Sequence, residues 1–267
     1  PRMFQYNLLK TAQSDLKHIV LPEGTDPRIL RASRDLIHHG AARLTLLGDP
    51  AQIREQIRSM KLDLDPNSLQ ILDPRHAPQF EEYAQTLYEL RKHKNVDLTM
   101  AMDLMADVSY FGTMMVYKGD ADGMVSGAVH TTQHTIRPAL QFVKTKPGVS
   151  LVSSVFFMCL PDRVVVFGDC AINPNPNAPE LAEIALSSAH TANAFGKAGG
   201  AKQFPPKCRL FVMSGVHDED VSRLHRVNRL HLQLVRFRWY LRDGDGFSGE
   251  DAAANSLGRS ERTDSRT

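Results

Sequence analysis

The sequence predicts an α/β fold, in which strands alternate with helices and neighbouring strands pair in parallel. Three observations predict it. Short apolar runs alternate with amphipathic segments over the first 196 residues, Asp-Pro pairs mark helix starts between them, and apolar residues make up 42% of the 267 residues. A chain of this composition can bury a sizeable core, and its length suits one large domain or two small ones.

The first half of the chain repeats a strand–helix step. Apolar runs are followed by Asp-Pro pairs at Asp26 and Asp49, where Asp would cap a helix and Pro would take its first position. The helix that begins at Asp26 is expected to stop at Gly40. Strands are expected at His18–Leu21, Arg43–Leu47 and Leu69–Leu72, and further helices at Gln79–His93, Asp97–Ala106 and Ser109–Tyr117.

The second half continues this alternation, with a break at Pro147-Gly148 that is the most natural boundary between two lobes. We therefore expect a first α/β lobe over residues 1–148 and a partial second lobe over residues 149–196. Strands are expected at Met124–Val129, Leu151–Leu160 and Val164–Phe167, and helices at Thr131–Phe142 and Ala178–Ala194.

The composition changes beyond Gly196, so residues 197–267 are expected to form a divergent, Arg-rich tail. Lys197–Thr267 contains ten Arg and three Lys, whereas the first 196 residues contain eleven Arg and eight Lys. Residues 244–267 are rich in Gly, Ser, Asp and Arg and have no apolar period. We expect disorder from about residue 244 onward.

Charge and hydropathy argue against several classes of protein. The net charge of +2 disfavours a protein built mainly for nucleic acid. No apolar run reaches the roughly 20 residues of a membrane helix, and the N-terminus lacks the apolar region of a secretory signal. Cys159, Cys170 and Cys208 lack metal-ligand spacing and fit a reducing, cytoplasmic setting. The chain opens on Pro1 instead of Met, as a fragment or a processed product would.

The turn at residues 126–132 is a candidate anion site. A predicted buried strand leads into it and a predicted helix follows, so backbone N–H groups and hydroxyls would gather at the helix start. A glycine there would let the backbone approach a ligand closely. An ordinary strand–turn–helix with a Thr N-cap explains the pattern as well. The candidate residues are Ser126, Gly127, His130, Thr131 and Thr132.

Two arginines and one strand end supply further candidates. Arg137 lies in the predicted helix after the turn, and Arg91 lies at the end of an earlier helix. Arginine suits bidentate recognition of phosphate oxygens, although solvated surface positions or a helix dipole also explain these residues. Polar residues follow the strand Val164–Phe167, where open α/β folds place ligands, although the Asn-Pro-Asn-Pro there also fits a stiff turn. These polar residues are Asp169, Cys170 and Asn173.

Eight motifs follow one another along the chain in a fixed order. They are Ile19–Gly24, Leu47–Pro50, Glu89–Lys94, Asp122–Thr132, Ile136–Gln141, Lys144–Gly148, Ser153–Phe157 and Gly168–Pro174. In this order they resemble phosphate acetyltransferase (phosphotransacetylase). The resemblance is nearly continuous over residues 5–196, and its Val-Ser-Gly-Ala-Val-His-Thr-Thr stretch is highly specific.

The resemblance implies a three-layer α/β/α, two-lobed fold of the isocitrate/isopropylmalate dehydrogenase-like kind, incomplete at the C-terminus, with its active site in the cleft between the lobes. It implies the reaction acetyl-CoA + phosphate = acetyl phosphate + CoA, by direct thiolate attack in a ternary complex. No cofactor or metal is implied beyond CoA as a substrate. Arg91, Arg137, Ser126, Gly127, Thr131 and Thr132 match the phosphate and substrate site, and His130, Asp169, Cys170 and Asn173 lie near the cleft.

The resemblance lacks one part that carries chemistry. The family's Asn-Asp-Leu-Ser-Arg-Gly motif, with its catalytic serine and carboxylate, has no match here, so the catalytic residues stay unassigned. The strand and helices that follow in the family are not recognisable after Lys197. We therefore expect little acetyl transfer by this chain alone, and exposed apolar faces on 151–160 and 178–194.

Three other interpretations stay open. One is phosphate butyryltransferase, a close relative. Another is a non-catalytic acetyl-CoA-binding or regulatory module, like the acyltransferase-like region of large malic enzymes. The third is a non-functional gene product. Intact relatives are often homodimers, and the resemblance implies neither a nucleic-acid nor a membrane partner.

Overall fold

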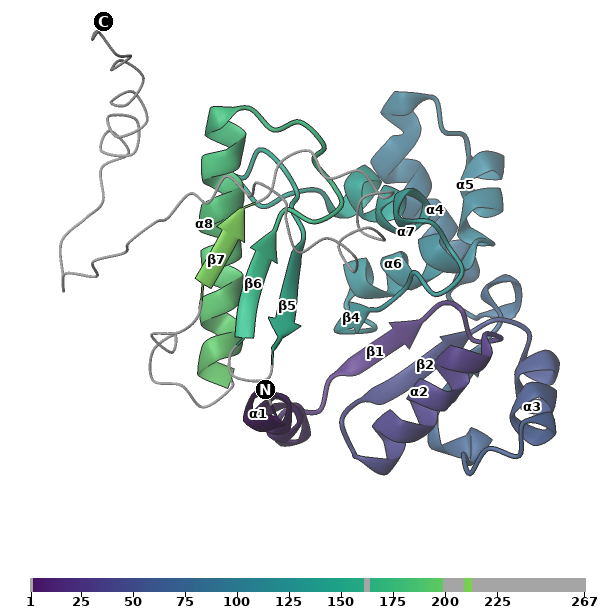
Figure 1. The fold of residues 1–267 in the computed structure, drawn as a ribbon. Coiled ribbons are helices and arrows are strands. Elements are labelled where there is room, and N and C mark those ends of the chain that lie inside the picture. Colours follow the sequence, from purple (N-terminus) through teal and green to yellow (C-terminus); the bar gives the residue numbers. More distant parts are fainter. Residues whose placement is uncertain (1, 161–163, 199–208, 213–267) are drawn as a thin grey trace, which may run out of the picture. The chain divides into compact units, whose positions relative to one another are not determined.

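The computed structural model describes residues 2–160, 164–198 and 209–212 (Figure 1). These residues all belong to one compact unit of the chain. The predicted disorder from about residue 244 lies outside the described residues. In the described part of the chain, no helix is both long and apolar enough to cross a bilayer.

A four-stranded sheet forms the centre of the first half of the chain (Figure 1). All of its strand pairs are parallel, so the predicted α/β class is confirmed. Because the carboxyl ends of parallel strands meet at one edge, the loops after the neighbouring strands β1 and β4 adjoin each other. The strand order is β3-β2-β1-β4, with β1 at His18–Leu21, β2 at Arg43–Leu47, β3 at Gln70–Leu72 and β4 at Gly123–Met124.

The two helices that follow β1 and β2 begin where the Asp-Pro pairs predict. In α2 (Pro27–His38) the Asp26 carboxylate accepts a hydrogen bond from the Arg28 N–H at 2.7 Å. In α3 (Pro50–Ser59) the Asp49 carboxylate accepts one from the Ala51 N–H at 2.7 Å. Each carboxylate satisfies an N–H group that has no partner within its own helix, which confirms both caps.

The first sheet is covered on both faces, which gives three layers. Successive side chains of a strand point to opposite faces, and Val20 and Leu21 of β1 belong to different buried cores. Val20 packs with Phe111 and other residues of the later helices, whereas Leu21 packs with residues of α2 and α3 such as Ile53. The later helices are α4 (Phe80–Arg91), α5 (Leu98–Met105) and α6 (Val108–Lys118).

A second, three-stranded sheet follows Pro147-Gly148 in the chain, in the order β5-β6-β7. The strands β5 and β6 pair in antiparallel fashion, so the predicted parallel pairing is wrong for them. Too few residues lie between these strands for the crossover connection that a parallel pair requires. β7 pairs in parallel with β6, so a strand exists where none was recognisable after Lys197. Their bounds are Val155–Cys159 (β5), Val164–Gly168 (β6) and Arg209–Val212 (β7).

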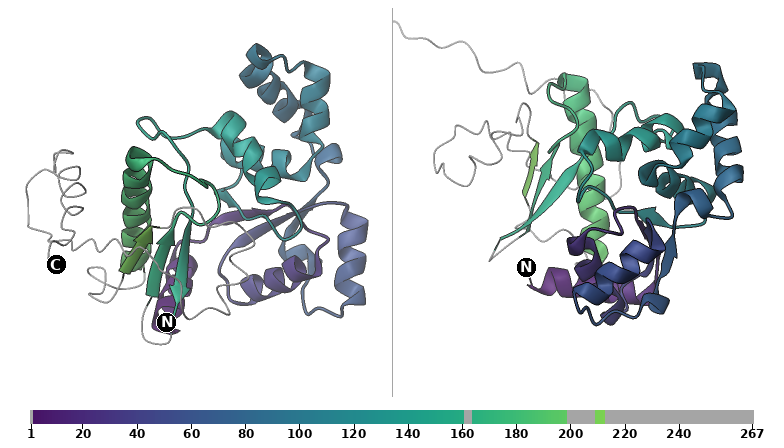
Figure 2. Two further views of the ribbon diagram at one scale, coloured as in Figure 1. Left: turned by 45° about the horizontal axis from the view of Figure 1, so that its top comes forward. Right: turned by 90° about the vertical axis from the view of Figure 1, so that its right-hand side faces the viewer.

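Two long helices accompany the second sheet. α8 (Ala178–Ala198) packs against β6 and β7, and both views in Figure 2 show it beside these strands. α1 (Arg2–Ser14) was not predicted; it contacts α8 and stacks Phe4 on Phe157 with ring centroids 5.9 Å apart. Phe156 and Met158 of β5 and Leu186 of α8 are exposed, in line with the expected apolar faces. The lobe boundary at Pro147-Gly148 stays a prediction.

One predicted strand is wrong. β4 ends at Met124 instead of continuing to Val129, and the side chains of Val125 and Val129 are 59% and 67% exposed. The chain leaves the sheet because the N–H groups from Gly127 onward bind a carboxylate instead of a neighbouring strand. The helix predicted at Thr131–Phe142 is divided into α7 (Thr132–Pro138) and a π-helical turn, η4 (Ala139–Val143).

Candidate functional site

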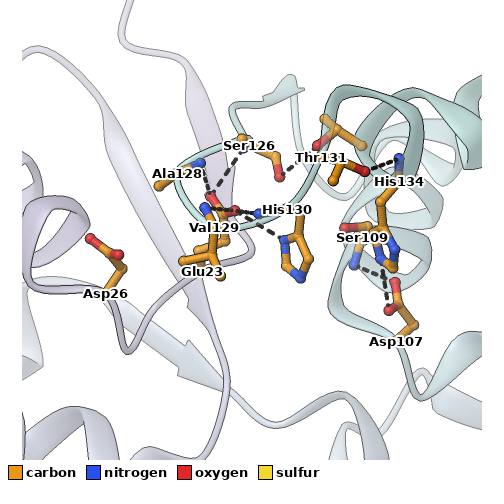
Figure 3. A network of polar contacts seen from close by, with 12 residues as sticks. Glu23, Asp26, Asp107, Ser109, Ser126, Ala128, Val129, His130, Thr131 and His134 are labelled. Carbon is orange, nitrogen blue, oxygen red and sulfur yellow. Dashed lines mark hydrogen bonds and ion pairs between the residues drawn. The ribbon is translucent and has the colours of Figure 1, made fainter.

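The loop after β4 closes around the carboxylate of Glu23, which follows β1 (Figure 3). Glu23 Oε2 accepts hydrogen bonds from the N–H groups of Gly127 at 3.1 Å and Ala128 at 2.8 Å. Its Oε1 accepts from the N–H groups of Val129 at 2.6 Å and His130 at 2.8 Å. Four successive N–H groups thus converge on one carboxylate, which is the geometry of a backbone anion nest.

Glu23 is ionised in this nest. Only 5% of the residue is exposed, and burial would raise its pKa, but the four N–H donors outweigh burial and lower the pKa below its ordinary value of 4.5. Gly127 has φ of +113°, a conformation that L side chains rarely adopt, and this turn brings its N–H to the carboxylate. The glycine is therefore needed for the loop itself.

Arg28, in the first turn of α2, binds the same loop from outside. Its guanidinium donates to the Ala128 carbonyl oxygen and to Asp26 Oδ2, the latter at 2.8 Å. This hydrogen bond holds the pKa of Asp26 at about 2. The helix start predicted at Asp26-Pro27 therefore also fixes the position of the candidate site.

Two histidines connect the loop to the start of α6 (Figure 3). His130 Nδ1 lies 3.0 Å from Glu23 Oε1, without the alignment of a hydrogen bond. The His130 ring stacks on that of His134, with centroids 4.7 Å apart and planes 13° apart. His134 Nε2 lies 3.0 Å from Oδ2 of Asp107, which caps α6.

The predicted hydroxyl residues stand at the start of α7. Thr131 is its N-cap, and its Oγ1 accepts a hydrogen bond from the His134 N–H at 3.2 Å. Thr131 and Thr132 are both exposed, while Ser126 Oγ lies 3.5 Å from Thr135 Oγ1. The N–H groups of residues 127–130 are not free to bind an external anion, because Glu23 occupies them. The phosphate role of Ser126, Gly127, Thr131 and Thr132 stays a prediction.

The positive charges of both predicted arginines act on the Tyr110 hydroxyl of α6. Arg91 Nη1 donates to the Gln141 carbonyl oxygen at 3.3 Å, and Tyr110 Oη donates to Gln141 Oε1 at 3.0 Å. Burial raises the pKa of Tyr110, while the charges of Arg137 and Arg91 act to lower it.

Both guanidinium groups keep hydrogen-bonding capacity. Arg91 Nε is buried and has no hydrogen-bond partner, although a buried donor is normally paired. Within residues 2–160, 164–198 and 209–212, neither Arg91 nor Arg137 forms an ion pair, whereas the neighbouring Lys92 pairs with Glu89 at 2.5 Å. The arginine pair is therefore a cationic position that lacks a protein anion among the described residues.

The candidates at the end of β6 form a separate network. The carboxylate of Asp169 accepts hydrogen bonds from the N–H of Ser154 at 2.9 Å, from the Ser154 hydroxyl, and from Nδ2 and the N–H of Asn173 at 2.6 and 2.7 Å. Burial would raise the pKa of Asp169, but these donors lower it. Burial raises the pKa of the Cys170 thiol, whose Sγ lies 3.2 Å from the Phe167 carbonyl oxygen. No hydrogen bond among the described residues joins this network to the arginines.

Comparisons with known proteins identify the family of the chain. The model of the phosphate acetyl/butaryl transferase family matches residues 3–227. The chain belongs to this family. A phosphate acetyltransferase from Synechocystis sp. is 59% identical over 196 residues, which are 73% of this chain and 28% of that protein. The crystal structure of a phosphotransacetylase from Streptococcus pyogenes is similar with a TM-score of 0.67 and 41% identity, over 73% of this chain and 59% of that chain.

Similarity to the family extends beyond Gly196, where the recognisable motifs end. A phosphate acetyltransferase from Deinococcus radiodurans is 42% identical over 269 residues, which are 99% of this chain and 36% of that protein. The family model likewise continues to residue 227, and β7 lies within this extension. The chain spans about a third of the length of the curated relatives named here.

Sequence reasoning missed three residues of the candidate site in this family member. Glu23, Tyr110 and His134 bind or orient the predicted residues, yet none was predicted to belong to the site. Glu23 alone left a signal, because it lies in the Ile19–Gly24 motif just after a strand, where open α/β folds place functional side chains.

Proposed function

We propose that the chain takes part in the transfer of an acetyl group between CoA and inorganic phosphate, and that Arg91 and Arg137 bind the phosphate. The supporting observation is that neither arginine has a carboxylate partner among the described residues, and that Arg91 Nε is a buried donor without a hydrogen-bond partner. A dianionic phosphate would supply the missing charge, and guanidinium groups bind its oxygens in pairs.

The remaining predicted residues complete the proposed site. The hydroxyls of Thr131 and Thr132 are exposed at the start of α7, the helix that carries Arg137, and would donate to further phosphate oxygens. Ser126 and Gly127 shape the turn before them. We place His130, Asp169, Cys170 and Asn173 near the cleft on the side of the acyl group and CoA. In this arrangement Cys170 is not the nucleophile, in keeping with its raised thiol pKa.

The proposed chemistry is a direct transfer in a ternary complex. The thiolate of CoA attacks the acetyl carbonyl of acetyl phosphate, and phosphate leaves toward the two arginines, whose positive charge stabilises it. In the reverse direction phosphate attacks acetyl-CoA. The substrates are acetyl-CoA, phosphate and acetyl phosphate, and no metal or cofactor takes part.

Two further proposals follow from family membership. A homodimer is the proposed assembly, and the cytoplasm is the proposed location, where Cys159 and Cys170 stay free thiols. The serine and carboxylate of the Asn-Asp-Leu-Ser-Arg-Gly motif have no match in the sequence. Weak acetyl transfer by this chain alone therefore stays our prediction, and phosphate binding is the property that its own residues should show.

The test separates binding from turnover. Isothermal titration with inorganic phosphate should show binding by the purified chain, and Arg91→Ala with Arg137→Ala should abolish it. Lys92→Ala serves as the matched control, because Lys92 adjoins Arg91 and already pairs with Glu89. Acetyl phosphate formation from acetyl-CoA is followed in parallel. Equal phosphate binding by the double arginine variant and the unmodified chain would refute the proposal.

A further inference from the structure

Glu23 binds the loop Gly127–His130, which leads directly into the proposed phosphate site at Thr131 and Thr132. It precedes this loop by more than 100 residues in the chain. We propose that Glu23 is a positioning residue for phosphate: its carboxylate fixes Gly127–His130, and thereby the direction of Thr131, Thr132 and the start of α7. This inference rests on the proposed function and adds a residue that would not contact the substrate.

The Glu23 carboxylate accepts hydrogen bonds from all four N–H groups of Gly127–His130. Each of its two oxygens accepts two hydrogen bonds, between 2.6 and 3.1 Å, which matches the acceptor capacity of an ionised carboxylate. These N–H groups lie away from any strand, so without Glu23 the loop would have no equivalent partner among the described residues. Its side chain is 2% exposed, so water cannot easily take its place.

The last of the four N–H groups belongs to His130, and Thr131 follows directly. A shift of the loop would therefore move the N-cap of α7 and the helix that carries Arg137. Thr131 is the residue through which the nest and the phosphate site are joined along the backbone.

A second connection runs through side chains. The His130 ring lies against Glu23 and stacks on His134, and His134 bonds to Asp107. Asp107 in turn accepts a hydrogen bond from the N–H of Tyr110 at 3.1 Å, and both the Tyr110 hydroxyl and Arg91 Nη1 bond to Gln141. Glu23 is thus linked through the backbone to α7, which carries Arg137, and through a chain of contacts to Arg91.

Glu23→Gln distinguishes positioning from simple space filling. Glutamine has the same shape but offers one oxygen and one amide NH₂, so two of the loop N–H groups would face a donor. We expect phosphate to bind on the order of tenfold more weakly, as the loss of a hydrogen bond to a charged group implies. Glu23→Asp keeps the charge on a shorter side chain and should give an intermediate affinity.

The experiment is a phosphate titration of the full chain and its variants, with folding checked by circular dichroism. Asp49→Asn is the matched control, because Asp49 also accepts backbone N–H groups but caps α3. Glu23→Ala is titrated with and without formate, whose carboxylate can enter the vacated nest. Formate should strengthen phosphate binding by Glu23→Ala and weaken or leave unchanged that of the unmodified chain, while equal chloride should not.

The outcomes separate the two proposals. Weaker binding in the order unmodified, Asp, Gln, with formate rescue of Glu23→Ala, supports the positioning role. Unchanged affinity in both Glu23→Gln and Glu23→Asp, while Arg91→Ala loses binding, overturns that role and leaves the proposed function intact. Unchanged affinity in Arg91→Ala and Arg137→Ala overturns the proposed function and this inference with it. If Glu23→Gln fails to fold, equal affinity of Glu23→Asp and failure of formate rescue still overturn the positioning role.

Discussion

Two buried carboxylates, Glu23 and Asp169, organise loops in different ways. Both follow a strand, both are almost fully buried at 5% and 6% exposure, and hydrogen bonds lower the pKa of each. Glu23 binds N–H groups that are 104 to 107 residues away, whereas the partners of Asp169 are 15 and 4 residues away. The same chemistry thus joins segments that are distant in the sequence in one case and segments that are close in the sequence in the other.

The largest effect on stability is expected from removing Asp169, which holds the network of Ser154 and Asn173. Asp169→Ala leaves donors of Ser154 and Asn173 without their acceptor, and should lower the free energy of unfolding by about 3 kcal/mol. Urea denaturation followed by circular dichroism measures this. Asp35→Ala, an exposed carboxylate of α2, should change it by less than about 0.5 kcal/mol. Equal losses in both variants would mean that the buried network does not stabilise the fold.

The next largest effect is expected at the proposed phosphate site. Arg91→Ala removes a half-buried guanidinium and should weaken phosphate binding by about 2 kcal/mol, or roughly thirtyfold. Arg91→Lys should restore little, because an ammonium group lacks the planar fork. Calorimetric titration with phosphate measures both variants. Full affinity in Arg91→Lys would show that charge alone matters there.

Acid should reduce the stabilisation that Glu23 and Asp169 each give to their loops. The pKa of each folded carboxyl is lowered, so its stabilisation is complete above the ordinary values of 4.5 for Glu and 3.8 for Asp, and is lost as the pH falls through the folded values. The free energy of unfolding should therefore decrease from about pH 5 downward. Glu23→Gln should decrease less steeply, which denaturation curves across this range would show. Parallel curves would contradict the ionised state of Glu23 in the nest.

The smallest effect on stability is expected at Asp49, a carboxylate that contacts neither the Glu23 loop nor the Asp169 network. Asp49→Ala removes the N-cap of α3 and should lower the free energy of unfolding by about 1 kcal/mol without changing phosphate affinity. Denaturation and titration of the same preparation measure the two quantities. A loss of affinity here would show that any destabilisation of the first sheet affects the site, and the contrast with Glu23 would disappear.

Local features were predictable from the sequence, and long-range ones were not. The caps at Asp26 and Asp49 depend on residues that are two positions apart, and both were predicted. The end of β4 at Met124 depends on Glu23, more than 100 residues earlier, so an apolar run was predicted to continue as a strand. The antiparallel pairing of β5 and β6 was missed because the alternation of strands and helices predicts parallel neighbours.

The same division holds for the candidate site. Arg91, Arg137, Thr131 and Thr132 were predicted because each stands in a motif of the family. Glu23 was missed as a site residue because its effect depends on the folded loop: a single glutamate in sequence gives no sign of the four N–H groups that it binds.

The most direct test of the proposed phosphate site is the ¹H–¹⁵N signal of Arg91 Nε during a titration with inorganic phosphate. This N–H is buried and unpartnered, so phosphate should give it its hydrogen-bond acceptor. If phosphate binds here, the Arg91 Nε signal and the backbone amide signals of Thr131 and Thr132 shift together with a single Kd. A saturating titration that moves none of them would contradict it.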